Sequence, residues 1–418
     1  STLNPKDQQT LTQLLEASTI VDGINNAAKE YEARTSAADL KCTLLTAKIL
    51  SVRSWAEDTK TEIQEAGEIE EIPFTEPNVF GISSPPKTYM APSNKPYVAT
   101  LKNACVFSGS SIILTEDGYA LSDTAGHPIF GSAVSFSYDS LVLAQSENEV
   151  LLDLSSYQTK SVGSAIMMAG LTSNAFGHWL PEFLPKLEFF QQHPNFDQLP
   201  LIIDSNMPES HVDHLRRLCG NQLIELGPNE CFICDQLLIA PSPAFSPIEL
   251  FQNNIPIKDM PGLSPRAMRF LQPPPQRNNN RNKRLFLARK GMQWRKLINE
   301  HEIASDLEQL GFETVYLETM STKEQIELFQ QADIIVAPNG SALLNLIFAA
   351  PEVKLLVLTQ PNLFNWGTFQ GPMDALGYKS VCVCGQYAIN TSEKHSDYTV
   401  DKGLIRRALA GFGIYNER

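Results

Sequence analysis

Residues 320–348, with the sequence MSTKEQIELFQQADIIVAPNGSALLNLIF, contain the clearest structural signals of the chain. Ser321 and Glu324 stand three residues apart before an apolar periodic run, a spacing typical of a capping box that begins a helix. The almost wholly apolar run at 333–337 predicts a buried strand. The Pro-Asn-Gly-Ser sequence at 338–341 predicts a tight turn into a second helix. A helix, a buried strand and a helix in this order indicate an α/β fold with a parallel sheet.

The same alternation continues on both sides of this stretch. The segments that flank 320–348 complete one α/β unit. Strands are expected at 284–288, 313–317 and 354–358, and a helix at 295–310. An earlier α/β unit is predicted from helices at 178–192 and 211–219 and strands at 201–204, 223–225 and 237–240. Two such units predict a ligand cleft, because doubly wound sheets bind ligands outside the carboxyl ends of their strands.

The rest of the chain has a different texture. Residues 1–66 space their apolar side chains by three and four from Asp7 onward, which predicts a helical extension packed on the body or on a partner chain. A connector rich in Pro, Gly and Ser follows at 67–96, and short β-branched and aromatic runs predict a β-rich insertion or platform at 97–161. A stretch dense in Pro and Asn at 241–282 predicts a linker. The expected domains are therefore a helical extension at 1–66, an N-terminal domain at 67–272, a C-terminal domain at 273–395, and a last helix at 396–418 that returns to the N-terminal domain.

Length and charge narrow the function classes. A chain of 418 residues fits two or three domains. Its net charge of −14 argues against a general nucleic-acid binder, which needs a basic face. There is no apolar run long enough to span a membrane and no leader pattern at Ser1, so we expect a cytoplasmic protein, peripheral at the inner face of the membrane. Seven cysteines without framework spacing favour reduced thiols.

Two features point to an anionic ligand. The Gly and small residues of the turn at 338–341 would let a phosphate approach backbone N–H groups at a helix start, although a tight turn without any ligand explains them equally well. Residues 276–296 hold eight basic and no acidic residues in an otherwise acidic chain. Within that segment Arg289 follows an expected strand and Arg295 opens an expected helix, so both would lie at the carboxyl edge of the sheet, where guanidinium groups can bind a diphosphate.

One pair could supply a base. His178 and Glu182 in NAFGHWLPE at 174–182 are four residues apart and would share one helix face. A histidine beside a carboxylate can form a base with a tuned pKa; a capping histidine and a surface glutamate are the structural alternative.

A metal site is not expected. The cysteine pairs Cys231/Cys234 and Cys382/Cys384 are half-sites at best and fit buried structural thiols. The chain has no Asp-x-Asp pair, Walker loop, Gly-x-Ser-x-Gly elbow or Gly-x-Gly-x-x-Gly fingerprint.

Three segments together resemble glycosyltransferase family 61, in order and spacing: NAFGHWLPEFLPKL at 174–187, RKGMQWRKLINE at 289–300, and the stretch at 320–348. This family includes plant xylan xylosyl- and arabinosyltransferases, animal enzymes that add N-acetylglucosamine to proteins, and bacterial capsule or lipopolysaccharide proteins. The resemblance implies a GT-B architecture, with two Rossmann-like domains facing a cleft and the nucleotide-sugar held by the C-terminal one. It also implies inversion at the anomeric carbon without an essential metal or other cofactor.

The resemblance also implies roles for individual residues. Glu182, oriented by His178, would be the catalytic base. The donor would be bound by Arg289, Arg295, Glu324, Gln325, Asn339, Gly340, Ser341 and Asn345. The chain departs from the family where many members have a histidine, since Asn339 stands there and can neither titrate nor carry charge.

The sequence thus predicts an inverting, metal-independent glycosyltransferase that moves a sugar from a nucleoside-diphosphate donor, a UDP-sugar, to a glycan or lipid-linked glycan in bacterial surface polysaccharide synthesis. Two alternatives stay open: a GT-B-like transferase with a non-nucleotide donor, such as a pyruvyl transferase, and a catalytically silent glycan-binding or scaffold subunit. Homo-oligomerisation through the N-terminal helices and no nucleic-acid partner are expected.

Overall fold

The structure is a computed structural model, and it describes residues 44–122, 136, 139–146, 148–243, 262–274, 281–291, 295–361, 364–388 and 396–415. The chain forms two compact units. Unit 1 consists of residues 1–69, 94–242 and 247–255, and unit 2 of residues 70–93, 243–246 and 256–418. Both have mixed α/β structure, which confirms the α/β part of the expected fold class.

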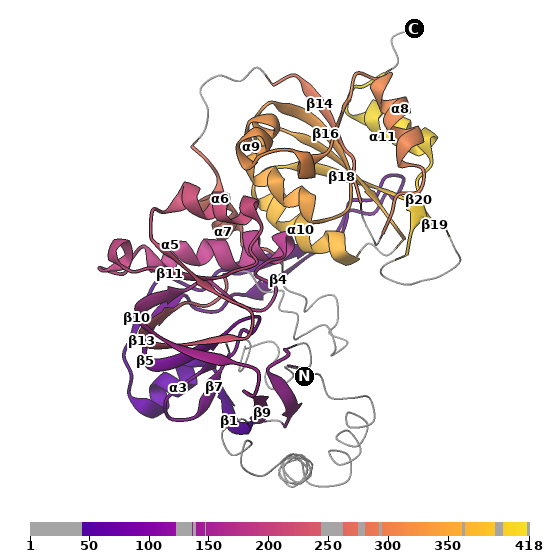
Figure 1. The fold of residues 1–418 in the computed structure, drawn as a ribbon. Helices are drawn as coiled ribbons and strands as arrows, with labels where there is room; N and C mark the ends of the chain where they lie inside the picture. The colour runs from indigo at the N-terminus through magenta and orange to yellow at the C-terminus, as the bar shows by residue number, and fades with distance from the viewer. Residues whose placement is uncertain are drawn as a thin grey trace. The chain divides into compact units, whose positions relative to one another are not determined.

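Unit 1 is built on one mixed sheet (Figure 1). Its strands in spatial order are β12 (Leu223–Leu226), β11 (Leu201–Asp204), β10 (Gln158–Met167), β13 (Glu230–Ile239), β5 (Tyr97–Phe107), β6 (Ile113–Leu114), β7 (Tyr119–Leu121), β1 (Leu44–Leu50), β9 (Glu149–Asp153) and β8 (Val142–Gln145), with β2 (Ile63–Glu65) on β5. The first four strands are parallel, and β5 joins β13 antiparallel. The β-rich segment is therefore a continuation of the first α/β unit's sheet and not a separate platform.

The helices of unit 1 are short: α3 (Val52–Thr59), α4 (Phe176–His178), the π-helical turn η1 (Trp179–Phe183), the 3-10 turn η2 (Leu184–Lys186), α5 (Leu187–Phe190), the 3-10 turn η3 (Phe196–Gln198) and α6 (Glu209–Leu218). Most of the segment 178–192 is helical, as expected, but the type of helix changes three times along it, from α to π, to 3-10 and back to α. Pro181 and Pro185 explain the changes, because neither has a backbone N–H for a regular helix.

The expected helical extension is confirmed at Val52–Thr59, which is helix α3, and is wrong for the strands on either side of it. Leu44–Leu50 is strand β1, which pairs antiparallel with β9 and parallel with β7. Pairing on both sides gives the backbone hydrogen bonds that outweigh the local helical spacing of its leucines. Residues 1–43 lie outside the described residues, as does any oligomer contact through them.

Unit 2 contains a five-stranded parallel sheet with the order β15 (Glu313–Val315), β14 (Lys283–Leu287), β16 (Ala332–Pro338), β17 (Lys354–Thr359) and β18 (Lys379–Cys384). In chain order this is 2-1-3-4-5, a common doubly wound arrangement. In Figure 1, α9 (Thr322–Gln330) and α10 (Phe364–Ala375) lie on one side of the sheet and α8 (Glu300–Glu308) and α11 (Lys402–Gly411) on the other. The 3-10 helices η6 (Leu317–Thr319) and η7 (Ser341–Phe348) complete the unit. The capping box predicted at Ser321 is confirmed.

Three boundaries of unit 2 differ from the expected domains. The connector at 67–96 contains a hairpin, β3 (Glu71–Thr75) with β4 (Thr88–Pro92), and the linker at 241–282 contains α7 (Pro265–Leu271); both hairpin and helix belong to unit 2. The last helix, α11, does not return to the N-terminal domain. Its buried Ile405 and Leu409 pack in the core of unit 2, where apolar strands offer more contact than a surface site. The small pair β19 (Gln386–Tyr387) and β20 (Tyr398–Thr399) precedes it.

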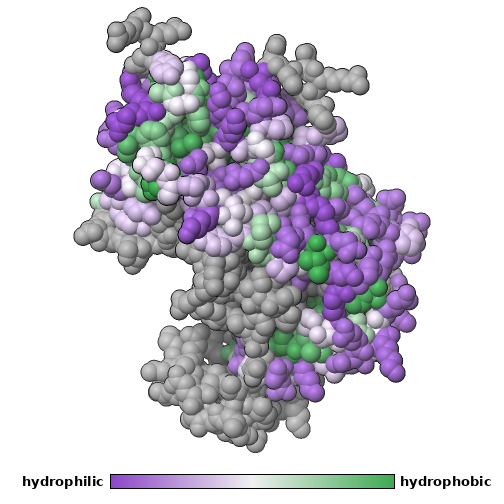
Figure 2. All heavy atoms as spheres, turned by 180° about the vertical axis from the view of Figure 1, so that it is seen from behind, coloured by the Kyte–Doolittle hydropathy of each residue, from purple (hydrophilic) through white to green (hydrophobic). Residues whose placement is uncertain are grey.

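Hydrophilic side chains cover most of the described surface seen in Figure 2, with apolar residues in small patches among them. Within the described ranges, none of the helices combines the length and apolar character needed to cross a bilayer.

Candidate active site

One candidate group of residues lies at the switch point of the unit 2 sheet. Arg289 stands two residues after β14, and Asn339 directly follows β16, the strand beside it. In this strand order, connections from β14 and β16 leave on opposite faces, so the loops after them diverge and leave a crevice at the carboxyl edge. The fold thus brings together two residues that are fifty positions apart.

The guanidinium of Arg289 is held by the turn after β16. Its Nη2 donates to the carbonyl oxygen of Pro338 at 3.1 Å and to that of Asn339. A Cβ on Gly340 would collide with the guanidinium, so glycine is needed for this close approach. Both acceptors are neutral, so they fix the group without cancelling its charge. Burial lowers the pKa of Arg289, and the positive charge of Arg295 lowers it further.

Arg295 lies on a loop, and its expected position at the start of a helix is wrong. The helix α8 begins at Glu300, and Arg295 has a φ of 55°, in the left-handed region. The reason is pairing with a distant segment: Lys296 and Ile298 exchange backbone hydrogen bonds with Tyr398 at 2.9 and 2.8 Å. The Nε of Arg295 is buried and has no partner in the described part of the chain, and burial lowers the pKa of its guanidinium.

A cavity of about 400 Å³ lies beside Arg289. Its lining residues are Arg289, Gly291, Lys296, Leu297, Ile298 and Glu300. The carboxylate of Glu300 accepts the backbone N–H of Arg289 at 3.2 Å, and burial raises the pKa of this carboxyl group. Among the described residues, no carboxylate forms an ion pair with the guanidinium of Arg289 or Arg295. The charges of Glu300 and Glu318 act on Arg289 without pairing directly with its guanidinium, so the cavity is suited to an anion as a direct partner.

Two buried amides in the segment after β16 have oxygens without a hydrogen-bond donor among the described residues. Asn339 and Asn345 are 7% and 2% exposed. The Oδ1 of each lacks a hydrogen-bond donor within the described residues, while Nδ2 of Asn345 donates to the carbonyl oxygen of Ala342 at 3.3 Å. A buried oxygen without a donor costs about 1–3 kcal/mol, which a ligand N–H or O–H group would recover.

A second candidate group, separate from the first, lies in unit 1. Nδ1 of His178 is 2.8 Å from Oε1 of Glu182, and the two side chains are 25% and 13% exposed. The pair spans the π-helical turn η1, a distortion common at functional sites. Burial raises the pKa of Glu182, while the hydrogen bond and charge of His178 oppose the rise. In the tautomer that carries its proton on Nδ1, the imidazole donates to the Glu182 carboxylate.

Comparison with known families assigns this region. The family model Glycosyltransferase 61 matches residues 176–356. This part of the chain is therefore similar to glycosyltransferase family 61. Comparison with curated proteins gives no significant match.

The glycosyltransferase 61 region contains every site residue expected from the sequence, and the class of activity it supports is glycosyl transfer. Within unit 2 the fold gathers Arg289, Arg295, Asn339 and Gly340 around the two central strands, with Ser341 and Asn345 on the following helix η7. Glu324 and Gln325 have local partners instead. The carboxylate of Glu324 accepts from the N–H and hydroxyl of Ser321 at 2.8 and 2.7 Å, and Nε2 of Gln325 donates to the carbonyl oxygen of Leu317 at 3.0 Å. Contact of these two with a donor stays a prediction.

Sequence patterns did not indicate the residues that anchor the loop before the helical segment at Phe176–His178. Asp204, 6% exposed at the end of β11, accepts the Gly170 N–H at 3.1 Å and the Ser173 hydroxyl at 2.6 Å. Ser111 accepts the Leu171 N–H at 3.0 Å, and the ring of His211 hydrogen-bonds to the backbone of Ser173. The one sequence feature that could have indicated this anchor is an aspartate, Asp204, at the end of an apolar strand.

Aromatic rings support the same helix from behind. The ring of His211 stacks on that of Trp179, the residue next to His178, with centroids 5.8 Å apart and planes 4° apart. The indole N–H of Trp179 donates to the carbonyl oxygen of His211 at 3.2 Å. Phe176 also contacts His211 and His214. The helical segment that carries the candidate base therefore packs against α6 through these aromatic contacts.

A second missed group lies outside the family 61 match. Tyr398 is 2% exposed, donates its hydroxyl to the carbonyl oxygen of Leu358 at 3.0 Å, and lies near the charges of both arginines. Asp397 accepts the N–H of Lys296 at 2.8 Å. This segment holds the wall of the cavity in place, and nothing in its local sequence marks it as part of a site.

Proposed function

We propose that the chain is an inverting glycosyltransferase that binds a nucleoside-diphosphate sugar through unit 2 and transfers the sugar to a hydroxyl group of a glycan acceptor. A UDP-sugar is the proposed donor, and a glycan or lipid-linked glycan of bacterial surface polysaccharide, such as capsule or lipopolysaccharide, is the proposed acceptor. The proposal includes a GT-B arrangement of the two units during the reaction.

One observation supports this assignment above all others: the guanidinium of Arg289, which has no ion-pair partner among the described residues, lies beside a cavity at the switch point of a doubly wound sheet, and the charge of Arg295 acts on it. A diphosphate supplies the missing negative charge and matches the fork of donors that a guanidinium presents. The unsatisfied oxygens of Asn339 and Asn345 are suited to N–H or O–H groups of a nucleoside. With Asn339 in place of a titratable histidine, this recognition would not depend on protonation.

The proposed step is a single displacement. The base removes the proton from an acceptor hydroxyl, whose oxygen forms a bond to the anomeric carbon from the face opposite the leaving group. The bond from that carbon to the diphosphate oxygen breaks, and its electron pair leaves with the nucleoside diphosphate. Arg289 and Arg295 stabilise the charge that develops on this leaving group, the role that a metal ion plays in other enzymes.

The His178–Glu182 pair is the proposed base. Glu182 is the proton acceptor in this assignment, and its raised pKa brings its basicity closer to neutral pH. His178 orients the carboxylate through the contact between Nδ1 and Oε1. The half-buried ring of His178 is itself a group that can take up a proton, so the two groups are tested separately below.

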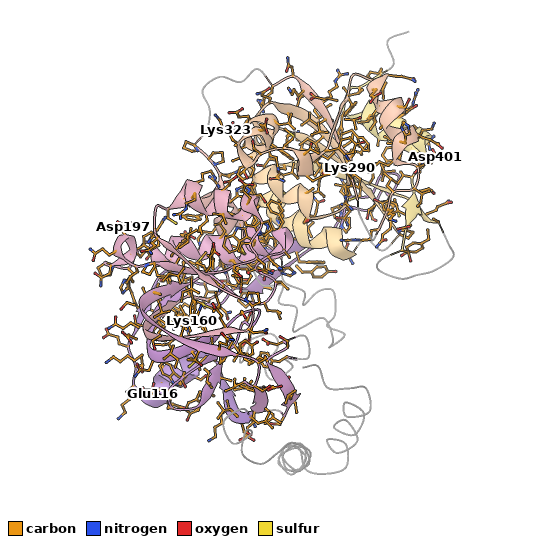
Figure 3. The ribbon with its side chains drawn as sticks, in the orientation of Figure 1. Glu116, Lys160, Asp197, Lys290, Lys323 and Asp401 are labelled. Carbon is orange, nitrogen blue, oxygen red and sulfur yellow. The ribbon has the colours of Figure 1, made fainter. Side chains whose placement is uncertain are left out.

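Nucleotide binding tests the donor assignment. The heat stability of the protein is measured with uridine, guanosine, cytidine and adenosine mono- and diphosphates, each with and without magnesium, and affinity is then measured calorimetrically. We expect stabilisation by UDP that does not require magnesium. Arg289→Lys keeps the charge but loses the fork, and it should weaken binding by about 1.5–3 kcal/mol, whereas the exposed control Lys323→Ala should not (Figure 3).

Other outcomes overturn the proposal. Selective stabilisation by another base would replace UDP as the donor nucleotide. The absence of any nucleotide effect would remove the donor assignment and favour a non-nucleotide donor or a silent glycan-binding subunit.

A further inference from the structure

A second cavity lies in unit 1, outside the family 61 match. Its volume is about 570 Å³, within the range of about 300–1,000 Å³ for small-ligand sites. Helix α3 and the residues after it contribute Trp55, Thr59 and Thr61, strand β5 contributes Thr100 and Lys102, and the turn between β6 and β7 contributes Thr115, Glu116 and Asp117. Glu116 is labelled in Figure 3, near α3 of Figure 1. None of the residues of the candidate active site lines this cavity.

The walls of the cavity are fixed before any ligand binds. The indole N–H of Trp55, a side chain only 7% exposed, lies 3.3 and 3.4 Å from the carboxylate oxygens of Asp117. Asn103 donates to the carboxylate of Glu116 at 2.8 Å. The turn that carries both acids is closed by the Tyr119 N–H, which donates to the Thr115 hydroxyl at 3.0 Å. Pre-formed walls reduce the entropy lost on binding.

The lining contains both hydrogen-bond donors and hydrogen-bond acceptors. The Thr59 hydroxyl donates to the Trp55 carbonyl oxygen at 2.8 Å, so in its 2.8 Å contact with the Thr61 hydroxyl it is the acceptor. Lys102 adds donors, and Glu116 and Asp117 add acceptors. Two acids against one base disfavour phosphate groups, and the charged and hydroxyl groups that lie among the apolar surface of the lining disfavour a purely apolar ligand. A ligand dense in hydroxyl groups, each able to donate and accept, matches this lining.

We propose that this cavity binds a saccharide, neutral or bearing an amino group, as a glycan-anchoring site separate from the nucleotide site. The assignment goes beyond the proposed transfer reaction and does not depend on it. Anchoring one part of a glycan raises the effective concentration of its other parts at the same protein. The site would therefore favour long glycans over single sugars.

Ligand-observed saturation-transfer NMR tests this site on the full chain. The probes are maltotriose, cellotriose, chitotriose and xylotriose, each with and without saturating UDP. We expect one or more trisaccharides to bind, with signals that UDP does not displace. The variant Lys102→Ala/Asp117→Ala changes two side chains of the lining, and Lys48→Ala/Asp235→Ala changes two exposed residues of the same unit that are not part of the lining.

The expected effect is a loss of affinity of about ten-fold or more in the cavity variant, the size of a lost hydrogen bond to a charged group, and no change in the control. Retained thermal stability and UDP response show that the cavity variant is folded; if it were not, Thr100→Val and Thr61→Val would carry the comparison. Absence of binding by all four probes overturns the proposal. So does binding that the cavity variants leave intact, binding that UDP displaces, or a calcium titration that shows an ion in place of a sugar.

Discussion

The guanidinium of Arg289 occupies the space left by the missing side chain of Gly340, so these two residues, each following a central strand of unit 2, fix each other's position. The contact couples the phosphate-binding candidate to the turn that carries Asn339. A disturbance on either side should therefore reach the nucleotide site.

Gly340→Ala tests this relationship. The added Cβ would push the guanidinium out of its place, and because the φ of Gly340 is 169°, alanine adds a clash without backbone strain. We expect nucleotide affinity to fall by about ten-fold or more, or about 1.4 kcal/mol, in calorimetric titration. Gly411→Ala is the matched control, since a Cβ there meets no atom within 4 Å. Unchanged affinity in Gly340→Ala would separate Arg289 from donor binding.

Glu182→Gln tests the base. The amide keeps the shape of the carboxylate but cannot accept the acceptor's proton, so the turnover rate should fall by about 10²–10⁴-fold while nucleotide affinity stays the same. Because burial raises the pKa of Glu182 in the folded state, its contribution to stability falls as pH rises through that pKa. The variant should therefore unfold at the same or a higher temperature than the parent at pH 7.5. Full activity in Glu182→Gln would exclude it as the base.

The pH dependence of transfer should show the same group. The active form of Glu182 is deprotonated, so activity rises with pH through its pKa, which burial places above the ordinary value of about 4.3. His178 lowers the pKa of Glu182, so His178→Asn should move the acid limb of kcat/KM to higher pH. Loss of the acid limb in His178→Asn would instead identify the imidazole as the titrating base.

Asp204→Asn tests the anchored loop. The substitution weakens the acceptor of the Gly170 N–H and the Ser173 hydroxyl, and we expect a loss of about 1–3 kcal/mol of unfolding free energy. The loop leads into the helix of His178, so the turnover rate should fall as well, with nucleotide affinity unchanged. Ser173→Ala removes one of the two bonds and should give an intermediate loss. A stability loss without any change in turnover would make Asp204 a purely structural residue.

Acidic pH should weaken the packing of the helical segment at His178 against α6 and lower the stability of the protein. Burial lowers the pKa of His211 to about 4, and burial together with Arg217 lowers that of His214 to about 3. The unfolded chain takes up these protons near pH 6.5, so stability is lost as pH falls from about 6.5 toward 4. His211→Phe keeps a ring against Trp179 and removes one proton site. Its melting temperature should drop less between pH 7.5 and 5 than that of the parent; an equal drop would contradict the assignment.

The sequence predicted correctly those elements and contacts that depend on residues close together in the chain. The capping box at Ser321 and Glu324 forms as expected, with the Glu324 carboxylate on the Ser321 N–H. The strand expected at 201–204 is β11, and His178 and Glu182 meet because a four-residue spacing in a helical turn places side chains on one face. Each of these features involves residues no more than four positions apart, so the local pattern and the side-chain chemistry suffice to predict it.

Only the tertiary structure decided the contacts between distant segments. Leu44–Leu50 became a strand because β7 and β9 supplied partners for its backbone, and Arg295 left the expected helix because the neighbouring residues pair with Tyr398. The meeting of Arg289 with Gly340 depends on which strands lie side by side, a choice made by the packing of whole apolar faces. The sequence by itself therefore determined the α/β alternation and the residue types of the site, while the order of strands determined which of those residues meet.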